Sequence, residues 1–443
     1  MRTLFANGHI ATMDEAGTEI ANGWLLVDDG FVEDVGSDNP PPAEAYENLA
    51  GALVTPGLVN THHHLFQTLT RTRAQQADLF TWLRHLYPLW QQIDADAEYA
   101  GARAGLAELV LSGCTTVFDH HYVFPRGASG LLEAEIQAAR ELGVRIVAAR
   151  GSMDLGESDG GLPPDELVEE REHVVAETRR AAELHEPGPG AFVQVAVAPC
   201  SPFSVTKQLM TDSAELAREL RLQLHTHLAE TIEEEEFCQG IFGCRPLEYL
   251  EQVGWLADDV WCAHCVHLSG DDVRRMGAAG TGVAHCPSSN MRLGAGIAPV
   301  REMLDERVRV GLGVDGPASN ERSDLLNETR QALLVARARK GPEAMTPREA
   351  LGLATRGGAE VLRRDDLGSL EPGKCADFAV WRTDALEFGG ADDPVAALVL
   401  SAPHRPDRVY VGGREVVRDG QLVHGDEHEI TAEHRRHAQR FAA

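Results

Sequence analysis

Eight short apolar runs rich in β-branched residues alternate with segments of helical periodicity, and this alternation constrains the fold more than any other feature of the chain. Continuous apolar strands that alternate with helices are typical of a parallel sheet covered on both faces. Eight such units predict the α/β class and a (β/α)8 TIM barrel. We expect helices between the strands, for example at 97–112 and at 165–184, the second opening after a Pro-Pro pair. The predicted strands cover residues 52–59, 115–119, 145–149, 192–198, 222–227, 260–266, 281–285 and 308–314.

Both ends of the chain have a different pattern, in which Asn-Gly, Asp-Gly and Gly-Gly turns interrupt short strands. The pattern covers residues 3–36 and 376–423, and neither segment is long enough to bury a core alone. We therefore expect residues 1–51 and 370–443 to form one small β-sandwich domain from both termini. The barrel would then occupy residues 52–369.

The chain is strongly acidic, with 69 acidic residues against 40 basic ones and a net charge of −29. This balance argues against nucleic acid as a partner, because phosphate binding needs basic patches.

No apolar run reaches the roughly eighteen residues of a membrane span, and no signal peptide is recognisable at the N-terminus. Eight cysteines in 443 residues do not form a disulfide framework, and several lie inside apolar strands. We therefore expect a cytoplasmic protein.

Three consecutive histidines, His62, His63 and His64, end the first predicted strand. Neighbouring residues on a strand point to opposite faces, so His62 and His64 share one direction and His63 does not. Two imidazoles that share a face at this spacing are typical of metal ligands.

Ionisable residues also stand near the carboxyl ends of the last four predicted strands, on the side where barrel enzymes keep their active sites. Any one of them alone is most simply a core histidine or a strand-end carboxylate. Their joint occurrence at successive strand ends instead indicates one shared site. They are His225 and His227 with Glu230 after them, then His264, His285 and Asp315.

Four segments around these residues resemble the signatures of deaminases in the amidohydrolase superfamily. They are PGLVNTHHH at 56–64, HTHLAE at 225–230, AHCVH at 263–267 and GVDG at 313–316. Residues 368–377 also resemble the segment in that family where the chain leaves the barrel and re-enters the small β domain. The similarity therefore covers essentially the whole sequence. The resemblance implies one divalent metal bound by His62, His64, His227 and Asp315, and the catalytic residues Glu230, His264 and Asp315.

The residue types agree with these implied roles. Three imidazoles and a carboxylate suit Zn²⁺, with Fe²⁺ as the second choice, and leave a position for water. The ion would lower the pKa of that water to about 7 and supply hydroxide at neutral pH. Glu230 would shuttle protons to the leaving ammonia, and Asp315 would take the proton of the water. His264 would hold the hydroxide and polarise the developing charge.

A single metal is expected because binuclear members of the superfamily bridge two ions with a carbamylated lysine on strand 4. The chain has three lysines, Lys207, Lys340 and Lys374, and none lies in the strand predicted at 192–198.

The Gly-x-Gly-x-x-Gly pattern at 311–316 is not interpreted as a dinucleotide-binding motif, because it closes the eighth predicted strand and encloses a candidate metal ligand.

Three residues are candidates for substrate binding. Gln67 would form a hydrogen bond with a ring carbonyl, and Trp82 would stack on a flat ring or form a wall beside it. For both residues, ordinary packing is an equal alternative. Cys200 stands where adenosine-type deaminases of the superfamily carry His and where guanine deaminases carry Arg.

Further segments resemble the bacterial 8-oxoguanine deaminases within this superfamily, namely residues 119–125, 150–153, 160–164 and 285–292. This resemblance implies that 8-oxoguanine and water give urate and ammonia, with isocytosine as a smaller substrate. The alternatives on the same scaffold are an s-triazine amino- or chlorohydrolase of the hydroxyatrazine type and a guanine or pterin deaminase.

A non-catalytic barrel scaffold is the alternative from a different class, and the intact ligand set argues against it. As partners we expect a small nucleobase-like molecule and further copies of this chain in a homo-oligomer, but no nucleic acid and no membrane.

Overall fold

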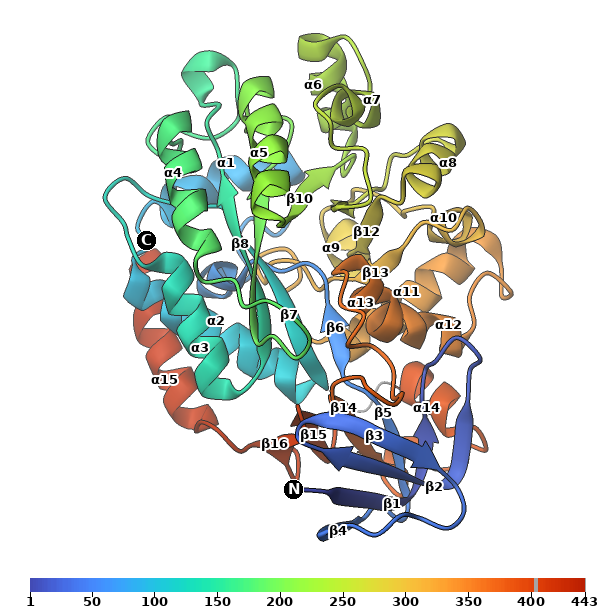
Figure 1. Ribbon diagram of the computed structural model, residues 1–443. Coiled ribbons are helices and arrows are strands. Elements are labelled where there is room, and N and C mark those ends of the chain that lie inside the picture. The colour runs from blue at the N-terminus through green and yellow to red at the C-terminus, as the bar shows by residue number, and fades with distance from the viewer. Residues whose placement is uncertain (402–404, 443) are drawn as a thin grey trace.

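Eight parallel strands close into a barrel in the computed structural model, which describes residues 1–401 and 405–442 (Figure 1). Their hydrogen-bonded order is β10-β11-β12-β13-β6-β7-β8-β9, so the predicted barrel is confirmed. Every residue of β7 and β8 is buried, because helices cover the outside of these strands and side chains fill the inside. The barrel strands are β6 (Leu58–Asn60), β7 (Cys114–His121), β8 (Arg145–Ser152), β9 (Val193–Pro199), β10 (Gln223–Leu228), β11 (Val260–His264), β12 (Gly282–His285) and β13 (Val310–Leu312).

Helices surround the barrel on its outer side (Figure 1). The helix predicted at 97–112 is α2, which begins after Asp94 because the Asp94 carboxylate accepts the backbone N–H of Ala97. In the part of the chain that the structure describes, no helix combines the length and apolar character needed to span a membrane. The helices are α1 (Leu79–Trp90), α2 (Ala95–Leu111), α3 (Leu131–Leu142), α4 (Arg171–Ala182), α5 (Lys207–Leu220), α6 (Ile232–Phe242), α7 (Pro246–Gln252), α8 (Gly270–Ala279), α9 (Pro287–Arg292), α10 (Val300–Asp305), α11 (Leu325–Lys340), α12 (Pro347–Gly352) and α13 (Gly358–Val361).

The helix predicted at 165–184 begins later than expected, at Arg171 of α4. Glu169 explains the difference, because its backbone N–H donates to the carbonyl of Met153 at 2.8 Å. Its carboxylate also pairs with the buried Arg150 guanidinium at 2.6 Å. These bonds hold the residues before Arg171 against the end of β8, so the helix cannot extend back to the Pro-Pro pair.

The two ends of the chain meet in one nine-stranded sheet beside the barrel, which confirms the small β domain expected from both termini (Figure 1). The order is β17-β16-β15-β14-β5-β1-β2-β3, and β4 pairs with β1. Two helices of the C-terminal segment pack against barrel helices instead, α14 (Pro394–Ser401) on α11 and α12, and α15 (Glu427–Ala438) on α2. The strands are β1 (Thr3–Ala11), β2 (Glu19–Asp28), β3 (Phe31–Gly36), β4 (Ala45–Asn48), β5 (Ala52–Pro56), β14 (Phe378–Arg382), β15 (Arg408–Val411), β16 (Arg414–Arg418) and β17 (Gln421–Leu422).

The run at 52–59 is two strands in two different sheets, and the prediction of one strand there is wrong. β5 pairs with β14 and β1 in the nine-stranded sheet, whereas β6 pairs with β7 and β13 in the barrel. Gly57 separates them, and a Cβ at this position would lie 2.2 Å from the Thr115 hydroxyl oxygen. The chain can therefore cross closely over the start of β7 only with glycine at this point.

An ion pair joins the base of the barrel to the nine-stranded sheet. Arg145 on β8 binds Asp377 in a bidentate pair, with Nε to Oδ2 at 2.8 Å and Nη2 to Oδ1 at 3.0 Å. Both side chains are buried, at 5% and 4% exposure. Asp377 Oδ1 also accepts the backbone N–H of Gly412 at 2.6 Å. Buried charges are tolerated only when they are paired in this way, so each partner requires the other.

Candidate metal centre and active site

Five side chains from four barrel strands converge at the carboxyl ends of those strands. His62 and His64 follow β6, His227 lies on β10, His264 ends β11 and Asp315 follows β13. All five are buried, with exposures of 8% or less. Residues separated by more than half the chain therefore meet in one place, as expected for the carboxyl edge of a parallel barrel.

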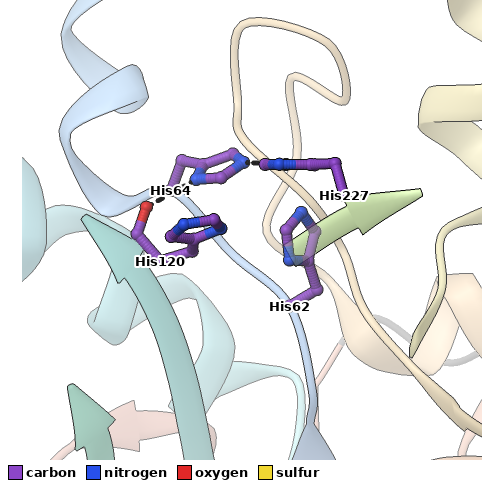
Figure 2. Close-up of side chains that lie close together, drawn as sticks. All are labelled: His62, His64, His120 and His227. Atoms are coloured by element: carbon purple, nitrogen blue, oxygen red, sulfur yellow. Dashed lines mark hydrogen bonds between the residues drawn. The ribbon is translucent and has the colours of Figure 1, made fainter. Parts of the chain in front are cut away.

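His64 and His227 face each other across this place (Figure 2). The Nδ1–H of His64 donates to the carbonyl of His120, and that of His227 donates to the carbonyl of Cys200, both at 2.7 Å. A carbonyl can only accept, so the Nε2 atom of each neutral ring carries a lone pair without hydrogen. These two Nε2 atoms lie 3.2 Å apart. Two lone pairs at this distance repel unless a cation lies between them.

A relay of side chains orients the third imidazole. His225 donates from Nδ1 to the carbonyl of Trp261 at 3.0 Å, so its Nε2 is an acceptor. That Nε2 accepts the Nδ1–H of His62 at 2.9 Å. The Nε2 of His62 is consequently bare, buried and without a hydrogen-bond partner, and it lies 3.3 Å from Asp315 Oδ1. His225 therefore supports a neighbour and does not face the cluster with a free nitrogen.

These atoms fit a divalent cation. Burial lowers the pKa of His62 and of His64 to about 3, so both rings are neutral and able to ligate at neutral pH. Asp315 Oδ1 lies 3.4 Å from His64 Nε2 and adds a negative oxygen to the three bare nitrogens. Three imidazoles and one carboxylate form a donor set that suits zinc or iron and leaves a position for water.

His120 completes a group of four imidazoles, and sequence reasoning missed it (Figure 2). Its Nε2–H donates to the carbonyl of Ala198 at 2.8 Å, which leaves Nδ1 buried and without a partner. Its ring also stacks on His227 with centroids 5.0 Å apart. The Asp-His-His run at the end of the second predicted strand was a usable signal, because polar residues at that end of a barrel strand face the site.

Backbone strain is concentrated at the ends of β11 and β13. His264, Cys265 and Asp315 adopt φ values of 70°, 51° and 63°. Residues with a side chain rarely adopt this left-handed conformation, which costs about 1–3 kcal/mol. Such strain is retained where the surrounding structure requires one particular side-chain position, as at a functional site.

Glu230 lies beside His264, with 3.5 Å between Glu230 Oε2 and His264 Nε2. Glu234 fixes the backbone of the loop that follows β10, because its two carboxylate oxygens accept the backbone N–H groups of Ala229 and Glu230 at 2.8 and 3.0 Å. Burial raises the pKa of Glu230 to about 7. A carboxyl group with this pKa can both take up and release a proton near neutral pH.

His264 donates from Nδ1 to the side-chain oxygen of Asn290 at 2.9 Å, which directs Nε2 toward two carboxylates. These are Glu230 and Asp315, whose Oδ2 lies 3.9 Å from His264 Nε2. Burial lowers the pKa of His264, but the charges of Glu230 and Asp315 outweigh it, and the net pKa is raised. The Nε2 of His264 is therefore a hydrogen-bond donor into the site.

A cavity opens next to the cluster, and the three residues nominated for substrate binding, Gln67, Trp82 and Cys200, line it. Aromatic and aliphatic side chains make up half of the other lining residues, which suits a flat ring. The other lining residues are His64, Leu79, Leu83, Tyr87, Tyr122, Phe203, His227, Glu230, His264, Leu293, Asp315 and Ser319.

Hydrogen bonds fix the orientation of Gln67 and Trp82. The indole N–H of Trp82 donates to the carbonyl of Ala318 at 3.1 Å, so the ring offers only its apolar surface to the cavity. The amide nitrogen of Gln67 donates to the Tyr122 hydroxyl at 3.3 Å, and its Oε1 is buried without a partner. A Cβ on residue 316 would lie 1.9 Å from this oxygen, so Gly316 is what leaves room for Gln67.

Cys200 contributes to the site in two ways. Its main-chain carbonyl accepts the Nδ1–H of His227, whereas its thiol lines the cavity. Burial raises the pKa of the thiol to about 12, so the group is neutral at physiological pH. This part of the wall is consequently small and uncharged.

The sequence matches a known family and curated relatives over nearly its whole length. The model of the amidohydrolase family matches residues 53–416. The 8-oxoguanine deaminase of Pseudomonas aeruginosa is 47% identical over 98% of both chains. The hydroxydechloroatrazine ethylaminohydrolase of Pseudomonas sp. strain ADP is 38% identical over 97% of this chain and 93% of its own.

Solved structures agree with this similarity. The atrazine chlorohydrolase from Arthrobacter aurescens TC1 complexed with zinc superimposes with a TM-score of 0.95 at 34% identity. The match covers 98% of this chain and 100% of the other. The barrel and the attached sheet are therefore shared with a zinc-binding hydrolase.

Proposed function

This chain belongs to the amidohydrolase family, and on that premise we propose that it is a metal-dependent aminohydrolase that acts on 8-oxoguanine. Water adds to the ring carbon that carries the exocyclic amino group, the bond from carbon to that nitrogen breaks, and urate and ammonia are the products. The observation that carries this proposal is the similarity to the Pseudomonas aeruginosa 8-oxoguanine deaminase across nearly all of both chains.

We assign metal binding to His62, His64, His227 and Asp315. The bare Nε2 atoms and the Asp315 oxygen that faces two of them support this assignment. When bound, a divalent ion supplies a Lewis acid that lowers the pKa of a water molecule to about 7. Zn²⁺ is the proposed ion, because the donor set suits it and a solved relative is complexed with zinc.

Glu230 is the proposed proton carrier. Its raised pKa and its position beside His264 allow it to give a proton to the ring nitrogen, take up the proton that the added hydroxyl group releases, and pass that proton to the departing amine. Without these protons the leaving group would be an amide anion, which does not leave at neutral pH.

His264 and Asp315 have complementary proposed roles. His264 donates from Nε2 and stabilises the negative charge that develops on the attacking oxygen. Asp315 Oδ1 faces His62 and His64, whereas Oδ2 accepts from the Ser319 hydroxyl at 3.2 Å and lies toward His264. Oδ2 is therefore the oxygen proposed to take the proton that the attacking water releases.

Three residues are proposed to select the ring. Trp82 forms an apolar wall, and the unpartnered Oε1 of Gln67 accepts a ring N–H. The neutral thiol of Cys200 leaves space at the ring edge and imposes no charge there. An 8-oxo purine has an additional oxygen and N7–H compared with guanine, and this is the edge that needs such space.

The test is product formation by the purified, zinc-loaded protein. Equal amounts of urate and ammonia from 8-oxoguanine are expected, with little ammonia from a pterin. A hydroxylated aminotriazine is the decisive comparison, because a curated relative is a hydroxydechloroatrazine ethylaminohydrolase. Turnover of the triazine without turnover of 8-oxoguanine would replace the proposed substrate and leave the metal chemistry intact.

A further inference from the structure

A second group of metal-ligating side chains lies on the outer side of β7, away from the barrel interior. The strand alternates, so His120 joins the catalytic imidazoles while its neighbours Asp119 and His121 belong to this other group. Glu98 from α2 and Glu135 from α3 complete it, and the four side chains are fully buried at 0% exposure. One ligand atom from each of the four lies within 4.8 Å of the others. We call these four residues the outer cluster.

The outer cluster is left with unused ligand atoms. Both carboxylate oxygens of Glu98 and of Glu135, and Oδ2 of Asp119, have no hydrogen-bond partner. His121 donates from Nε2 to the carbonyl of Val123 at 2.7 Å. Its Nδ1 therefore faces the carboxylates, 3.4 Å from Glu98 Oε2, and makes no hydrogen bond.

The charge of the outer cluster is not balanced by the protein. Within residues 1–401 and 405–442, no lysine or arginine pairs with Glu98, Asp119 or Glu135, and their charge partners are His121 and, at 3.8 Å, His63. Burying an ionised carboxylate without a partner is strongly unfavourable, and three carboxylates here face each other. Either a cation or protons must therefore occupy this space.

We propose that the outer cluster binds a divalent transition-metal ion, distinct from the ion at the barrel mouth, through Glu98, Asp119, His121 and Glu135. Three carboxylate oxygens and one imidazole nitrogen form a donor set for Zn²⁺ or Mn²⁺. Such an ion would use the unpartnered oxygens and the free His121 nitrogen together.

The position of this ion gives it a structural role at the active site. Asp119 Oδ1 accepts the backbone N–H of Leu65 at 2.6 Å, and Leu65 directly follows the catalytic-site residue His64. The ion would fix Asp119 and, through that hydrogen bond, the backbone that presents His62 and His64. The ion would stabilise this backbone from the outer side of β7 and would not touch substrate.

Crystals of the unsubstituted protein grown with Zn²⁺ give the first test, through anomalous diffraction at the zinc absorption edge. Two peaks per chain are expected, one at the barrel mouth and one among the outer cluster with ligand distances of roughly 2.0–2.2 Å. A fully occupied mouth site with no anomalous peak at the outer cluster would overturn the proposal and leave shared protons as the explanation. This test needs no variant to fold.

Metal content of matched variants gives the second test. Glu135→Gln should lose one ion per chain and keep the mouth ion, whereas Asp315→Asn should lose the mouth ion and keep the outer one. Glu133→Gln is the control on the same helix, because Glu133 pairs with Arg180 at the surface and should keep both ions. Folding of each variant is checked by circular dichroism. If folded Glu135→Gln and the unsubstituted protein hold the same number of ions, the proposal is wrong.

Discussion

The Nε2 atoms of His64 and His227 lie 3.2 Å apart, and each ring gives its Nδ1 hydrogen to a main-chain carbonyl. The backbone therefore sets the tautomer of both rings. The accepting carbonyls belong to His120 on β7 and to Cys200, which directly follows β9, so the fold itself orients these candidate metal ligands before any ion binds.

Replacing Glu230 tests the proton carrier. Glu230→Gln keeps the shape of the side chain but cannot carry a proton, so turnover should fall by roughly 10²–10⁴-fold. Metal content should be unchanged, because Glu230 is not a proposed ligand. Ammonia release and zinc content measured on the same sample check both statements, and near-normal turnover would remove Glu230 from the mechanism.

Replacing His225 tests the relay that orients His62. In His225→Phe the acceptor for the His62 Nδ1–H is gone, so His62 can adopt the other tautomer. Zinc affinity, measured by competition with a chelator, should fall about 10–100-fold. His173→Phe is the control at an exposed histidine and should bind zinc normally. An unchanged affinity in His225→Phe would show that the relay has no influence on the site.

The buried pair between Arg145 and Asp377 should be required for stability. Asp377→Ala leaves the Arg145 guanidinium buried without its partner, so the free energy of unfolding should fall by about 3–5 kcal/mol. The double variant Arg145→Met with Asp377→Leu removes both charges and should recover most of that loss. Urea unfolding measures both, and a double variant no more stable than Asp377→Ala would contradict the charge explanation.

Cys200 should control substrate binding without affecting the metal. Cys200→Arg puts a bulky charged group in the cavity, so activity on 8-oxoguanine should fall at least about tenfold in kcat/KM. Zinc content should stay constant, because the short hydrogen bond of His227 Nδ1 goes to the main-chain carbonyl of residue 200 at 2.7 Å, whereas the Cys200 sulfur lies 4.0 Å from that nitrogen. Cys200→Ser preserves size and neutrality and should retain most activity. Loss of zinc in Cys200→Arg would mean that the thiol supports the metal site.

Sequence patterns located the barrel and the convergence of the site because both follow from local rules. The resemblance to amidohydrolase deaminases implied the ligands His62, His64, His227 and Asp315. Their places at strand ends separately indicated one shared site, because parallel strands bring such ends together. No knowledge of neighbouring loops was needed for that inference.

The features that sequence reasoning missed depend on contacts between distant segments. His120 joins the cluster because Ala198 on β9 accepts its hydrogen bond. The division of the run at 52–59 depends on the close approach of Gly57 to Thr115. The late start of α4 depends on the pairing of Glu169 with Arg150. None of these partners is adjacent in the sequence, so local periodicity could not reveal them.

Substrate choice depends on whether the cavity accepts the 8-oxo edge of the purine. The most direct measurement is kcat/KM for 8-oxoguanine and for guanine with the same zinc-loaded preparation. The neutral thiol of Cys200 and the unpartnered oxygen of Gln67 predict a preference for 8-oxoguanine of at least about 10², within the range that a site built around a hydrogen-bonded group can achieve. Equal values for the two purines would contradict the account.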